Sequence, residues 1–509
     1  MTREALWQRL SEPCDVLIVG GGITGAGILH EATRRGLRAV LVERGDYASA
    51  TSSRSSKLVH GGLRYLAEGK IGLTRESVIE REALLQAAPG LVDPMPFLMP
   101  HYRGRRPGRM ELGFGLALYD LFAGRRTHRY TDATETQQLA PTIASDELTG
   151  AHVYIDATTD DARLVLRLIG HACDGGAVAL NYIEATSMIR REGKIVGAEI
   201  TDRDSNRTAT ITASVVINAT GVFASGLRLR PLRGSHVLLP DWRLPLAQAI
   251  AIKHPADGRP VFAYPWLGAT LVGTTDVDHH DALTMEPHIS RAELSYLLAA
   301  LHAQFPRCDL READIIATYA GVRPVIDDGQ SDPSKAGRDH TVLTEPGMVT
   351  ITGGKLTTFR PMALAALRAA APMLAPKTFS LDERPIFTPT SLPESGLSLA
   401  VRQRLAGRFG PHAATLLNKA RENDMHAIGA LPFLWAELRW SAQREHVVHL
   451  DDLLLRRTRI GLLARNGGAS FLPRIRAICQ EELHWDDQRM AREEADYKER
   501  IAMRYGLPA

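Results

Sequence analysis

A glycine-rich segment between two short apolar runs constrains this chain more than any other feature. Residues 14–43 read CDVLIVGGGITGAGILHEATRRGLRAVLVE. The run DVLIV is typical of a strand buried on both faces, and a helical pattern follows the glycines. Gly20, Gly22 and Gly25 have the spacing G-x-G-x-x-G. In this spacing the first glycine permits a tight turn, the second lets a pyrophosphate approach the backbone, and the third lets the helix pack closely on the strand.

The residues after this turn complete a dinucleotide-binding unit. The helix N-terminus presents N–H groups and a positive dipole end to phosphates. Gly36 suits the end of that helix, and Arg38 to Val42 is a second buried parallel run that ends at Glu43. A carboxylate at this place accepts hydrogen bonds from ribose hydroxyls. Because strand, turn, helix and acidic strand end agree, the segment predicts a dinucleotide site rather than an ordinary glycine turn.

Length, charge and cysteine usage exclude several classes of protein. With 509 residues the chain is too long for one core and predicts two or three domains of about 100–200 residues each. A net charge of +3 is too small for a nucleic-acid binder, so no nucleic-acid partner is expected. Four scattered cysteines form no CxxC pair, which favours a reducing compartment and predicts no metal site. Without a signal-peptide core or a bilayer-length apolar window, the catalytic body is expected in the cytoplasm or on its membrane face.

A hydroxyl-rich segment follows the predicted ribose-binding strand. Residues 47–66 read YASATSSRSSKLVHGGLRYL, in which serines and threonine precede Lys57, His60, Arg64 and Tyr65. A solvated serine-rich linker is the ordinary explanation of such a composition. The position beside the nucleotide favours a functional loop instead, whose hydroxyl groups donate to phosphate oxygens or cofactor hydroxyls.

The order of these segments resembles the FAD-dependent, respiratory glycerol-3-phosphate dehydrogenases. The resemblance begins with GGGITGAGI and TSSRSSKLVHGGLRYL and covers most of residues 14–370. Later matching segments are RGSH at 233–236, GTTD at 273–276, YAGVRP at 319–324 and GGKLTTF at 353–359. The C-terminal part resembles the helical cap of that family more loosely. The fold that the resemblance implies is α/β with two dinucleotide-binding domains, an antiparallel-sheet substrate domain and an all-helical C-terminal cap.

Three domains are therefore expected. They are an FAD-binding domain at 1–86, 150–228 and 315–385, a substrate or membrane-facing domain at 87–149 and 229–314, and a helical domain at 390–509. Alternating segments predict an antiparallel meander of three strands, at 185–191, 195–202 and 207–213, and then a separate buried strand at 215–218. That strand ends in Ala219-Thr220-Gly221-Val222-Phe223, where the family more often has ATGPW, so only the turn is carried over.

The resemblance assigns cofactor contacts along these turns. The ATG turn and a second glycine turn, Gly353-Gly354, favour FAD over NAD. The helix that opens near Leu356 would stabilise negative charge on the reduced flavin. The expected FAD contacts are Gly20, Gly22, Ile23, Thr24, Gly25, Glu43, Arg44, Thr51, Ser52, Ser53, Ser56, Lys57, Leu58, Gly61, Ala185, Gly221, Gly354, Lys355, Leu356 and Thr357.

The implied chemistry needs a base and a cationic clamp. Oxidation of a secondary alcohol requires hydride transfer to flavin and removal of the hydroxyl proton. His236 is the preferred base, since an imidazole with a pKa of about 6.5 is largely neutral at working pH. A phosphomonoester with about two negative charges needs fixed cations, planar arginines for bidentate contact and a lysine as a point charge. The catalytic assignments are His236, Arg323 and Lys355; the substrate-binding assignments are Arg64, Tyr65, Thr274, Arg323, Lys355 and His60.

For His60, a structural role in packing is an equal alternative to substrate binding.

Several functions of the whole protein remain open. The reaction that the resemblance implies is oxidation of sn-glycerol 3-phosphate to dihydroxyacetone phosphate, with electrons passed to a membrane quinone. The alternatives are an oxidase that uses oxygen, an FAD-dependent hydroxy-acid or amino-acid oxidoreductase, and a non-catalytic flavin-binding protein. A carboxylate substrate needs one arginine, whereas three cations from distant motifs favour a phosphate.

An apolar stretch flanked by arginines predicts the membrane contact. Leu112 to Phe122 follows Arg103, Arg105, Arg106 and Arg109, and precedes Arg125, Arg126 and Arg129. Such a helix can lie in the headgroup plane, although a core helix with solvated charged ends has the same pattern. The family's use of quinone favours the membrane, at the cytoplasmic face of a bacterial inner membrane, as a peripheral or monotopic protein with a soluble pool. A homodimer is also expected.

Overall fold

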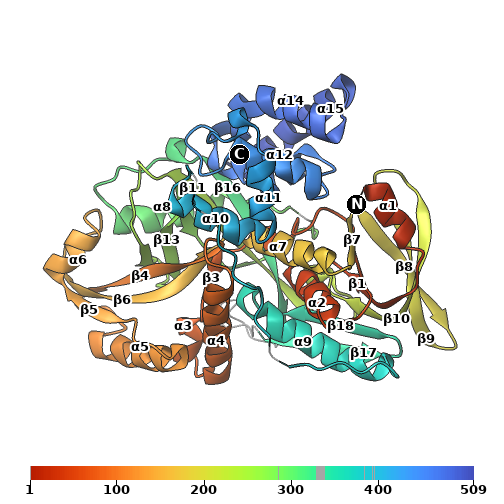
Figure 1. Ribbon diagram of the computed structural model, residues 1–509. Helices are drawn as coiled ribbons and strands as arrows, with labels where there is room; N and C mark the ends of the chain where they lie inside the picture. The colour runs from red at the N-terminus through yellow and green to blue at the C-terminus, as the bar shows by residue number, and fades with distance from the viewer. Residues whose placement is uncertain are drawn as a thin grey trace.

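The computed structural model describes residues 2–284, 286–327, 339–382, 384–392, 394 and 396–508. Two large sheets stand side by side, and the C-terminal helices lie at the top of the view in Figure 1. This arrangement has the expected parts: a mixed α/β nucleotide-binding half, a mainly antiparallel half and a helical cap. The domain boundaries predicted above stay predictions.

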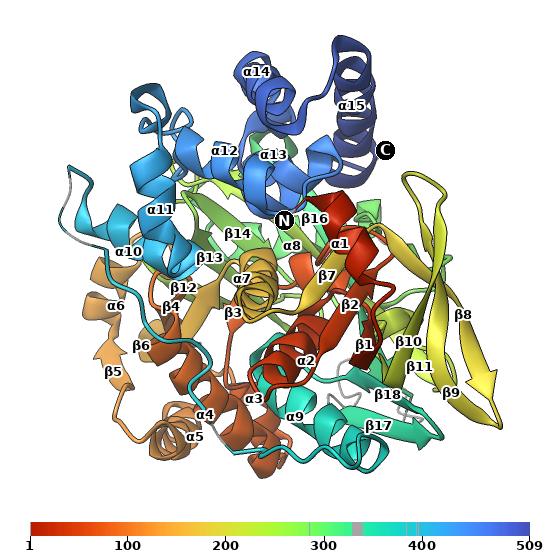
Figure 2. The same cartoon turned by 45° about the vertical axis from the view of Figure 1, so that its right-hand side comes forward.

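The first sheet holds the glycine-rich segment in its parallel centre. Its strands are β1 (Cys14–Val19), β2 (Ala39–Glu43), β7 (Val178–Asn181), β8 (Ile183–Arg191), β9 (Lys194–Asp202), β10 (Thr208–Asn218), β17 (His340–Glu345) and β18 (Met348–Gly353). β1 pairs in parallel with both β2 and β10, as expected for strands buried on both faces. Helix α2 (Ile23–Thr33) follows the glycines and packs against both α7 (Asp161–Asp174) and α9 (Phe359–Ala370), as Figure 2 shows.

One prediction about this sheet was wrong. The segments 207–213 and 215–218 are not two strands, because β10 runs unbroken from Thr208 to Asn218. Its first half, residues 208–212, pairs antiparallel with β9, and its second half, from residue 213, pairs in parallel with β1. No turn-forming residue separates the halves, so a single extended strand serves both the meander and the central sheet.

The second sheet is mainly antiparallel and carries the other wall of the site. Its strands are β3 (Leu58–Val59), β4 (Val92–Tyr102), β5 (Arg129–Asp132), β6 (Leu148–Thr159), β11 (Leu229–Pro240), β12 (Ala249–Lys253), β13 (Pro260–Trp266), β14 (Ala269–Gly273), β15 (Val277–Asp278) and β16 (Ala317–Ile326). Strands β13 and β14 form a hairpin, as the alternating segments Pro260 to Trp266 and Thr270 to Thr275 predict. The helices of this half are α3 (Leu63–Ala67), α4 (Ile71–Ala87), α5 (Arg109–Ala123), α6 (Ala133–Leu139) and α8 (Arg291–Gln304). The side chain of Ser290 caps α8 by accepting from the backbone N–H of Glu293.

The chain ends are helical and firmly packed. Helix α1 (Arg3–Arg9) buries Leu6 against the first sheet, so it is a packed helix rather than a free amphipathic turn. The C-terminal helices are α10 (Leu399–Phe409), α11 (His412–Lys419), α12 (Trp435–Arg444), α13 (Ile460–Leu463), α14 (Leu472–Leu483) and α15 (Asp487–Arg500). No helix in the described ranges has both the length and the apolar character needed to cross a bilayer.

Arg456 and Arg457 overturn a sequence-based interpretation. Adjacent arginines of this kind are typically a solvated pair or charges at a helix C-terminus, yet both side chains are buried in the π-helical turn Asp452–Arg457. Both guanidinium groups donate to the buried carboxylate of Asp46, which follows β2. The arginines therefore fasten the C-terminal helices to the nucleotide-binding sheet, a tertiary contact that no local pattern announces.

Removing the charge of Asp46 is expected to destabilise the protein strongly. Asp46→Asn leaves two buried arginines without their shared anion, which costs about 3–5 kcal/mol. The matched control is Arg190→Gln, which breaks an exposed pair with Glu345 and should cost about 0–1 kcal/mol. Urea denaturation followed by circular dichroism measures both losses, and equal losses would contradict a fastening role for Asp46.

Candidate active site

The glycine turn has the close contacts that its spacing predicts. Gly20 has a φ of +115°, and a Cβ there would lie 2.6 Å from the carbonyl oxygen of Ala219. A Cβ on Gly25 would lie 1.8 Å from the carbonyl oxygen of Gly20. Gly22 caps α2 without a side chain, and the neighbouring residues Ile23 and Thr24 are half-buried at the helix N-terminus. The backbone is therefore open to a phosphate where any larger residue would block the turn.

Glu43 stands at the expected strand end and also shapes the turn. One carboxylate oxygen accepts from the backbone N–H of Gly21 at 2.6 Å, and the other accepts from Gly45 at 2.8 Å. Burial raises the pKa of Glu43, and these two hydrogen bonds oppose that rise. The guanidinium of Arg44 lies 4.0 Å from the ring centroid of Phe223, beside the ATG turn. The ribose contact of Glu43 stays a prediction.

The hydroxyl-rich loop is anchored by a buried aspartate that the motif did not single out. Asp161, the first residue of α7, accepts from Ser55 Oγ at 2.7 Å and from Lys57 Nζ at 2.9 Å. Burial lowers the pKa of Lys57 to about 8, and Asp161 opposes that shift. Lys57 was expected to contact the cofactor, but its ammonium group lies in this buried cluster and not in the lining of the cavity described next.

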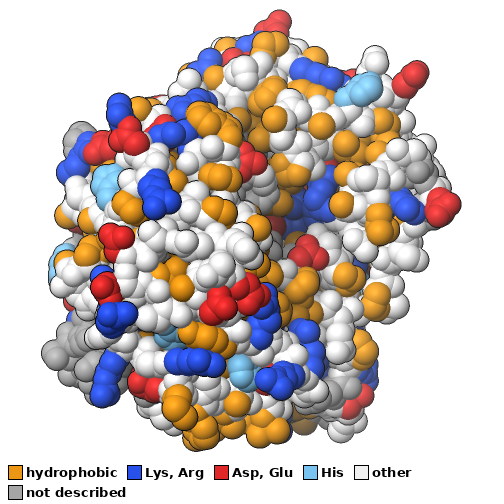
Figure 3. All heavy atoms as spheres, turned by 90° about the vertical axis from the view of Figure 1, so that its left-hand side faces the viewer, with side chains coloured by type: hydrophobic (Ala, Val, Ile, Leu, Met, Phe, Trp, Pro, Cys, Tyr) orange, Lys and Arg blue, Asp and Glu red, His pale blue; other side chains and the backbone are white. Residues whose placement is uncertain are grey.

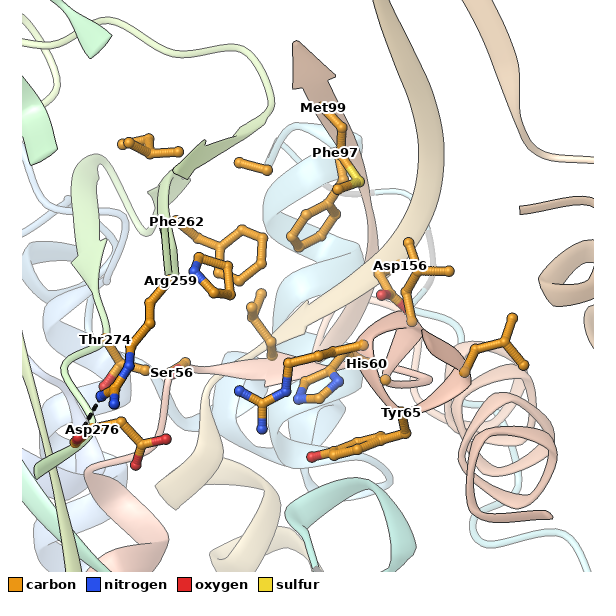
Figure 4. A pocket seen from close by; sticks show the side chains of 18 of the residues that line it. Ser56, His60, Tyr65, Phe97, Met99, Asp156, Arg259, Phe262, Thr274 and Asp276 are labelled. Carbon is orange, nitrogen blue, oxygen red and sulfur yellow. Dashed lines mark hydrogen bonds between the residues drawn. The ribbon is translucent and has the colours of Figure 1, made fainter. Parts of the chain in front are cut away.

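A cavity of about 900 Å³ is lined by strands and helices of the second half, by the hydroxyl-rich loop and by residues 354–357, which follow β18. It joins two chemically different regions: in Figure 4, Phe97, Met99 and Phe262 lie in the upper part of the view, and Thr274, His60 and Tyr65 lie below them. We call the region lined by His60, Arg64, Tyr65, His236, Thr274, Asp276, Arg323 and Lys355 the substrate end. We call the region lined by Phe97, Met99, Leu112, Phe114, Leu118 and Phe262 the apolar end.

Predicted residues are distributed between this cavity and the glycine turn. Those that line the cavity are Ile23, Thr51, Ser52, Ser56, Leu58, His60, Arg64, Tyr65, His236, Thr274, Arg323, Gly354, Lys355, Leu356 and Thr357. Ala185 lies on β8 and pairs with Ile200, outside the cavity lining. Gly61 is also outside that lining, and a Cβ there would lie 2.3 Å from Tyr119 Oη.

His236 is a buried imidazole at the substrate end. Its Nε2 lies 2.9 Å from Ser56 Oγ, and its ring stacks on Tyr319 with centroids 4.7 Å apart. Its Nδ1 is buried without a hydrogen-bond partner among the described residues. Burial, and then the charges of Lys57 and Arg323, lower its pKa well below the usual value. The free site therefore holds His236 neutral.

Two arginines meet at the GTTD segment. Arg323 Nη1 pairs with Asp276 Oδ1 at 2.9 Å, and Arg323 Nη2 donates to Thr274 Oγ1 at 3.2 Å. Arg259 Nη1 donates to the backbone carbonyl of Asp276 at 3.0 Å, and Figure 4 shows it beside Thr274. Arg259 was missed because its sequence neighbours form no motif; the hairpin brings it to the site.

Lys355 and Arg64 add positive charge on the other side of the substrate end. Lys355 Nζ lies 4.5 Å from the ring centroid of Tyr65 and donates to Ser77 Oγ on α4. Arg64 Nε pairs with Glu68 Oε1 at 3.3 Å, and its side chain remains partly exposed. These two cations and Arg323 come from segments far apart in sequence and line one cavity, as the phosphate clamp requires.

Asp156 is a second residue that sequence reasoning missed. Its buried Oδ1 accepts from the backbone N–H of Gly61 at 3.1 Å, from Arg81 at 2.7 Å and from Tyr119 at 2.7 Å. It therefore fixes the loop that carries His60. Asp156 and Tyr154 lie two residues apart on β6, so the sequence indicates that they share one face of the strand. That spacing does not reveal which residues Asp156 contacts.

Comparison with known proteins agrees with this geometry. The family described as FAD dependent oxidoreductase matches residues 15–360, and the C-terminal domain of alpha-glycerophosphate oxidase matches residues 358–490. The chain is 33% identical to the mitochondrial glycerol-3-phosphate dehydrogenase SDP6 of Arabidopsis thaliana, over 96% of this chain and 86% of that protein. It is 35% identical to an aerobic glycerol-3-phosphate dehydrogenase of Staphylococcus epidermidis, over 87% of this chain and 86% of that protein. The chain belongs to the FAD-dependent glycerol-3-phosphate dehydrogenases.

A solved structure of the same family confirms the fold along the whole chain. The glycerol-3-phosphate dehydrogenase from Bacillus halodurans, complexed with FAD, superposes with a TM-score of 0.78 at 28% identity. The superposition covers 99% of this chain and 97% of that one. The cofactor of the family is FAD, and the residues present fit it: the close approaches at Gly20 and Gly25 leave the open turn that a pyrophosphate needs.

Closing that turn is expected to remove the cofactor. In Gly25→Ala the added methyl group collides with the Gly20 carbonyl, so the turn must open and FAD should be lost on gel filtration. Gly170→Ala is the control, because that helical glycine faces open space and the substitution favours the helix. Flavin absorbance per protein distinguishes the variants, and full retention of FAD by Gly25→Ala would contradict the assignment.

Proposed function

We propose that this protein oxidises sn-glycerol 3-phosphate to dihydroxyacetone phosphate and passes the electrons to a membrane quinone. The observation that carries the proposal is the substrate end of the cavity, where one neutral imidazole and several cations from distant segments converge. The names of the matched relatives support the same substrate. Bound FAD would supply the hydride acceptor; the groups described below bind the substrate and move its proton.

His236 would take the hydroxyl proton. A neutral ring has one unprotonated nitrogen, and Ser56 is already hydrogen-bonded to Nε2, which fixes the ring in the cavity wall. A bound phosphate adds negative charge that offsets Arg323, one of the groups that lower the pKa of His236. Substrate binding therefore raises the proton affinity of the base at the moment when it is needed.

Arg323, Lys355 and Arg64 would hold the phosphate. Arg323 is kept in place by Asp276 and Thr274, and Lys355 by its contact with Tyr65. Planar guanidinium groups suit bidentate contact with phosphate oxygens, and the lysine contributes a point charge. The same arrangement is poorly matched to a hydroxy acid or an amino acid, whose single carboxylate needs fewer cations.

The substrate assignment is tested by an anaerobic titration. Addition of glycerol 3-phosphate to the purified holoprotein should bleach the visible flavin band. Bleaching by a hydroxy acid or an amino acid, but not by glycerol 3-phosphate, would replace the proposal with the alternative oxidoreductase. A peroxide assay without membranes separates quinone-linked turnover from an oxidase, which would form peroxide at the rate of substrate oxidation.

Loss of the base should slow the chemistry and spare the cofactor. His236→Gln is expected to lower the rate of anaerobic flavin reduction about 10²–10⁴-fold while FAD stays bound. His302→Gln on α8 is the control, because His302 contacts the Leu310 carbonyl and lies outside the cavity lining. Stopped-flow absorbance gives the rates, and an undiminished rate in His236→Gln would exclude this residue as the base.

Loss of Arg323 should weaken the binding of a phosphorylated substrate more than that of a substrate without phosphate. Arg323→Met removes a charged hydrogen-bond donor, worth about 1.5–3 kcal/mol, so glycerol 3-phosphate should bind about 10–150-fold more weakly. Glycerol, which lacks the phosphate, should be affected much less. Arg291→Gln, at an exposed pair with Glu312, controls for the loss of a positive charge. Equal weakening for both substrates would place Arg323 outside the phosphate site.

Helix α5 supports attachment to the membrane. Met110, Phe114 and Leu121 follow helical spacing and are 87%, 77% and 72% exposed. Exposing large apolar side chains along one helix face to water is unfavourable, so such a stripe marks an interaction surface. Figure 3 shows apolar side chains gathered along the lower edge of this face, with Lys and Arg side chains beside them. An exposed apolar stripe flanked by arginines fits an anionic bilayer surface. Location at the cytoplasmic face of an inner membrane and a homodimer complete the proposal.

Vesicle binding tests the membrane contact. Phe114→Ser together with Leu121→Ser should reduce flotation with anionic phospholipid vesicles, because both changes remove apolar surface from one helix face. Leu399→Ser is the control, since Leu399 is an apolar residue that is also exposed, at 61%, on the distant helix α10. Flotation that falls equally in both variants, or in neither, would remove α5 as the attachment surface.

A further inference from the structure

Two adjacent strands carry a continuous row of side chains from the substrate end to the far side of the cavity. On β4, Phe97, Met99 and His101 alternate on one face and line the cavity. On β6, the facing residues are Asp156, Tyr154 and His152, because Phe97 is paired with Tyr154 and Met99 with His152. The row therefore begins at the loop of His60, crosses aromatic surface, and ends at two histidines.

The two histidines are in direct contact. His101 Nε2 lies 2.7 Å from His152 Nδ1, and both side chains are buried. At this distance one nitrogen donates and the other accepts, so the pair shares a proton position. His101 lines the cavity, whereas His152 lies behind it, where a Cβ on Gly113 of α5 would be 3.3 Å from its Nε2.

Burial, and then the charges around the pair, lower the pKa of both histidines. Arg109 of α5 and Lys253 of β12 face His101, and His128 and Tyr130 face His152. Burial, followed by the charges of His101 and His128, lowers the pKa of His152 to about 4, and burial also lowers the pKa of His101. A proton placed on this pair is therefore readily given up.

The part of the cavity beside the pair has apolar aromatic surface on one side and charged side chains, Arg105, Glu111 and Lys253, on the other. Phe97 and Phe262 form an edge contact with centroids 5.7 Å apart, and Leu112 and Leu118 of α5 complete the wall. Phe114 of α5 belongs both to this lining and to the exposed apolar stripe. A lipid-soluble molecule can therefore enter the apolar end from the face that the previous section assigns to the membrane.

We propose that His101 and His152 form a proton-transfer pair for a quinone bound at the apolar end of the cavity, with His101 facing the quinone and His152 exchanging protons behind it. Reduction of a quinone to its hydroquinone takes up two electrons and two protons. Oxidation of the alcohol to the ketone releases the same two electrons and two protons, so the overall reaction balances. His101 delivers protons to the quinone oxygens, and the neighbouring imidazole of His152 resupplies His101.

A third, partly exposed histidine lies near His152. His128 Nδ1 lies 2.6 Å from Asp120 Oδ2, and its ring centroid is 6.5 Å from that of His152. Its side chain is partly exposed, so it exchanges protons with solvent. Because the pair is loaded with a proton less often as pH rises, the quinone-dependent rate should fall with rising pH in the wild type.

This inference rests on the quinone part of the proposed function. Its test does not use glycerol 3-phosphate, so it is independent of the substrate assignment. The holoprotein is reduced with dithionite, mixed with a short-chain ubiquinone analogue, and its reoxidation is followed by stopped flow. His101→Gln and His152→Gln should slow reoxidation by at least tenfold and flatten its pH dependence. Reoxidation by ferricyanide, which takes electrons without protons, should be unchanged in both variants.

Two further variants separate proton transfer from packing. His302→Gln replaces a histidine outside the cavity lining and should leave both rates unchanged. His101→Ala should regain quinone-dependent reoxidation when imidazole is added, which a merely structural role would not allow. The proposal is overturned if the glutamine variants lose both rates equally, or keep the wild-type rate with quinone. Failure of glycerol 3-phosphate to bleach the wild-type protein would instead overturn the substrate assignment alone.

Discussion

The buried carboxylate of Asp161 holds together three parts of the chain on which the active site depends. It begins α7, accepts from Ser55 and Lys57 of the hydroxyl-rich loop, and accepts from Arg459 of the C-terminal domain. Each of these charges is costly to bury alone, so the cluster is stable only when all members are present. This requirement fixes the loop at Ser56, and Ser56 in turn contacts His236. The helical cap is therefore part of the scaffold of the site, although none of its described helices lines the cavity.

The cavity separates two chemical tasks by polarity. The substrate end presents Arg323 and Lys355 to a water-soluble anion, and the apolar end presents Phe97 and Phe262 to a ligand that favours lipid. Strands β4 and β6 connect the two ends, since alternate residues of each strand share one face. An exposed apolar stripe on α5 lies beside the second end only. This polarity is the physical basis of the proposal that one cavity serves both a soluble alcohol and a membrane acceptor.

Much of the nucleotide-binding half was predictable because its signals are local. The spacing of Gly20, Gly22 and Gly25 predicted both the turn and its crowding, and the apolar runs predicted the parallel pairing of β1 and β2. Hairpin β13–β14 and helix α8 follow from alternation and from the capping serine. Where prediction failed, distant contacts decided the outcome. Arg456 and Arg457 have the pattern of a solvated pair, yet both are buried against Asp46. Lys57 remains a predicted FAD contact, and its ammonium group is bound by Asp161.

The sequence by itself determined the dinucleotide turn, the family, and the residue types needed for alcohol oxidation, since these depend on short spacings within contiguous segments. Only the tertiary structure decided which of those residues meet. It brought Arg259 to Asp276, set Asp156 beneath the loop of His60, and placed His101 against His152 at the end of a shared strand face. These contacts join residues from about 17 to 95 positions apart in the chain. Pairings of that kind are fixed by sheet register and burial of charge, which no local pattern of side chains specifies.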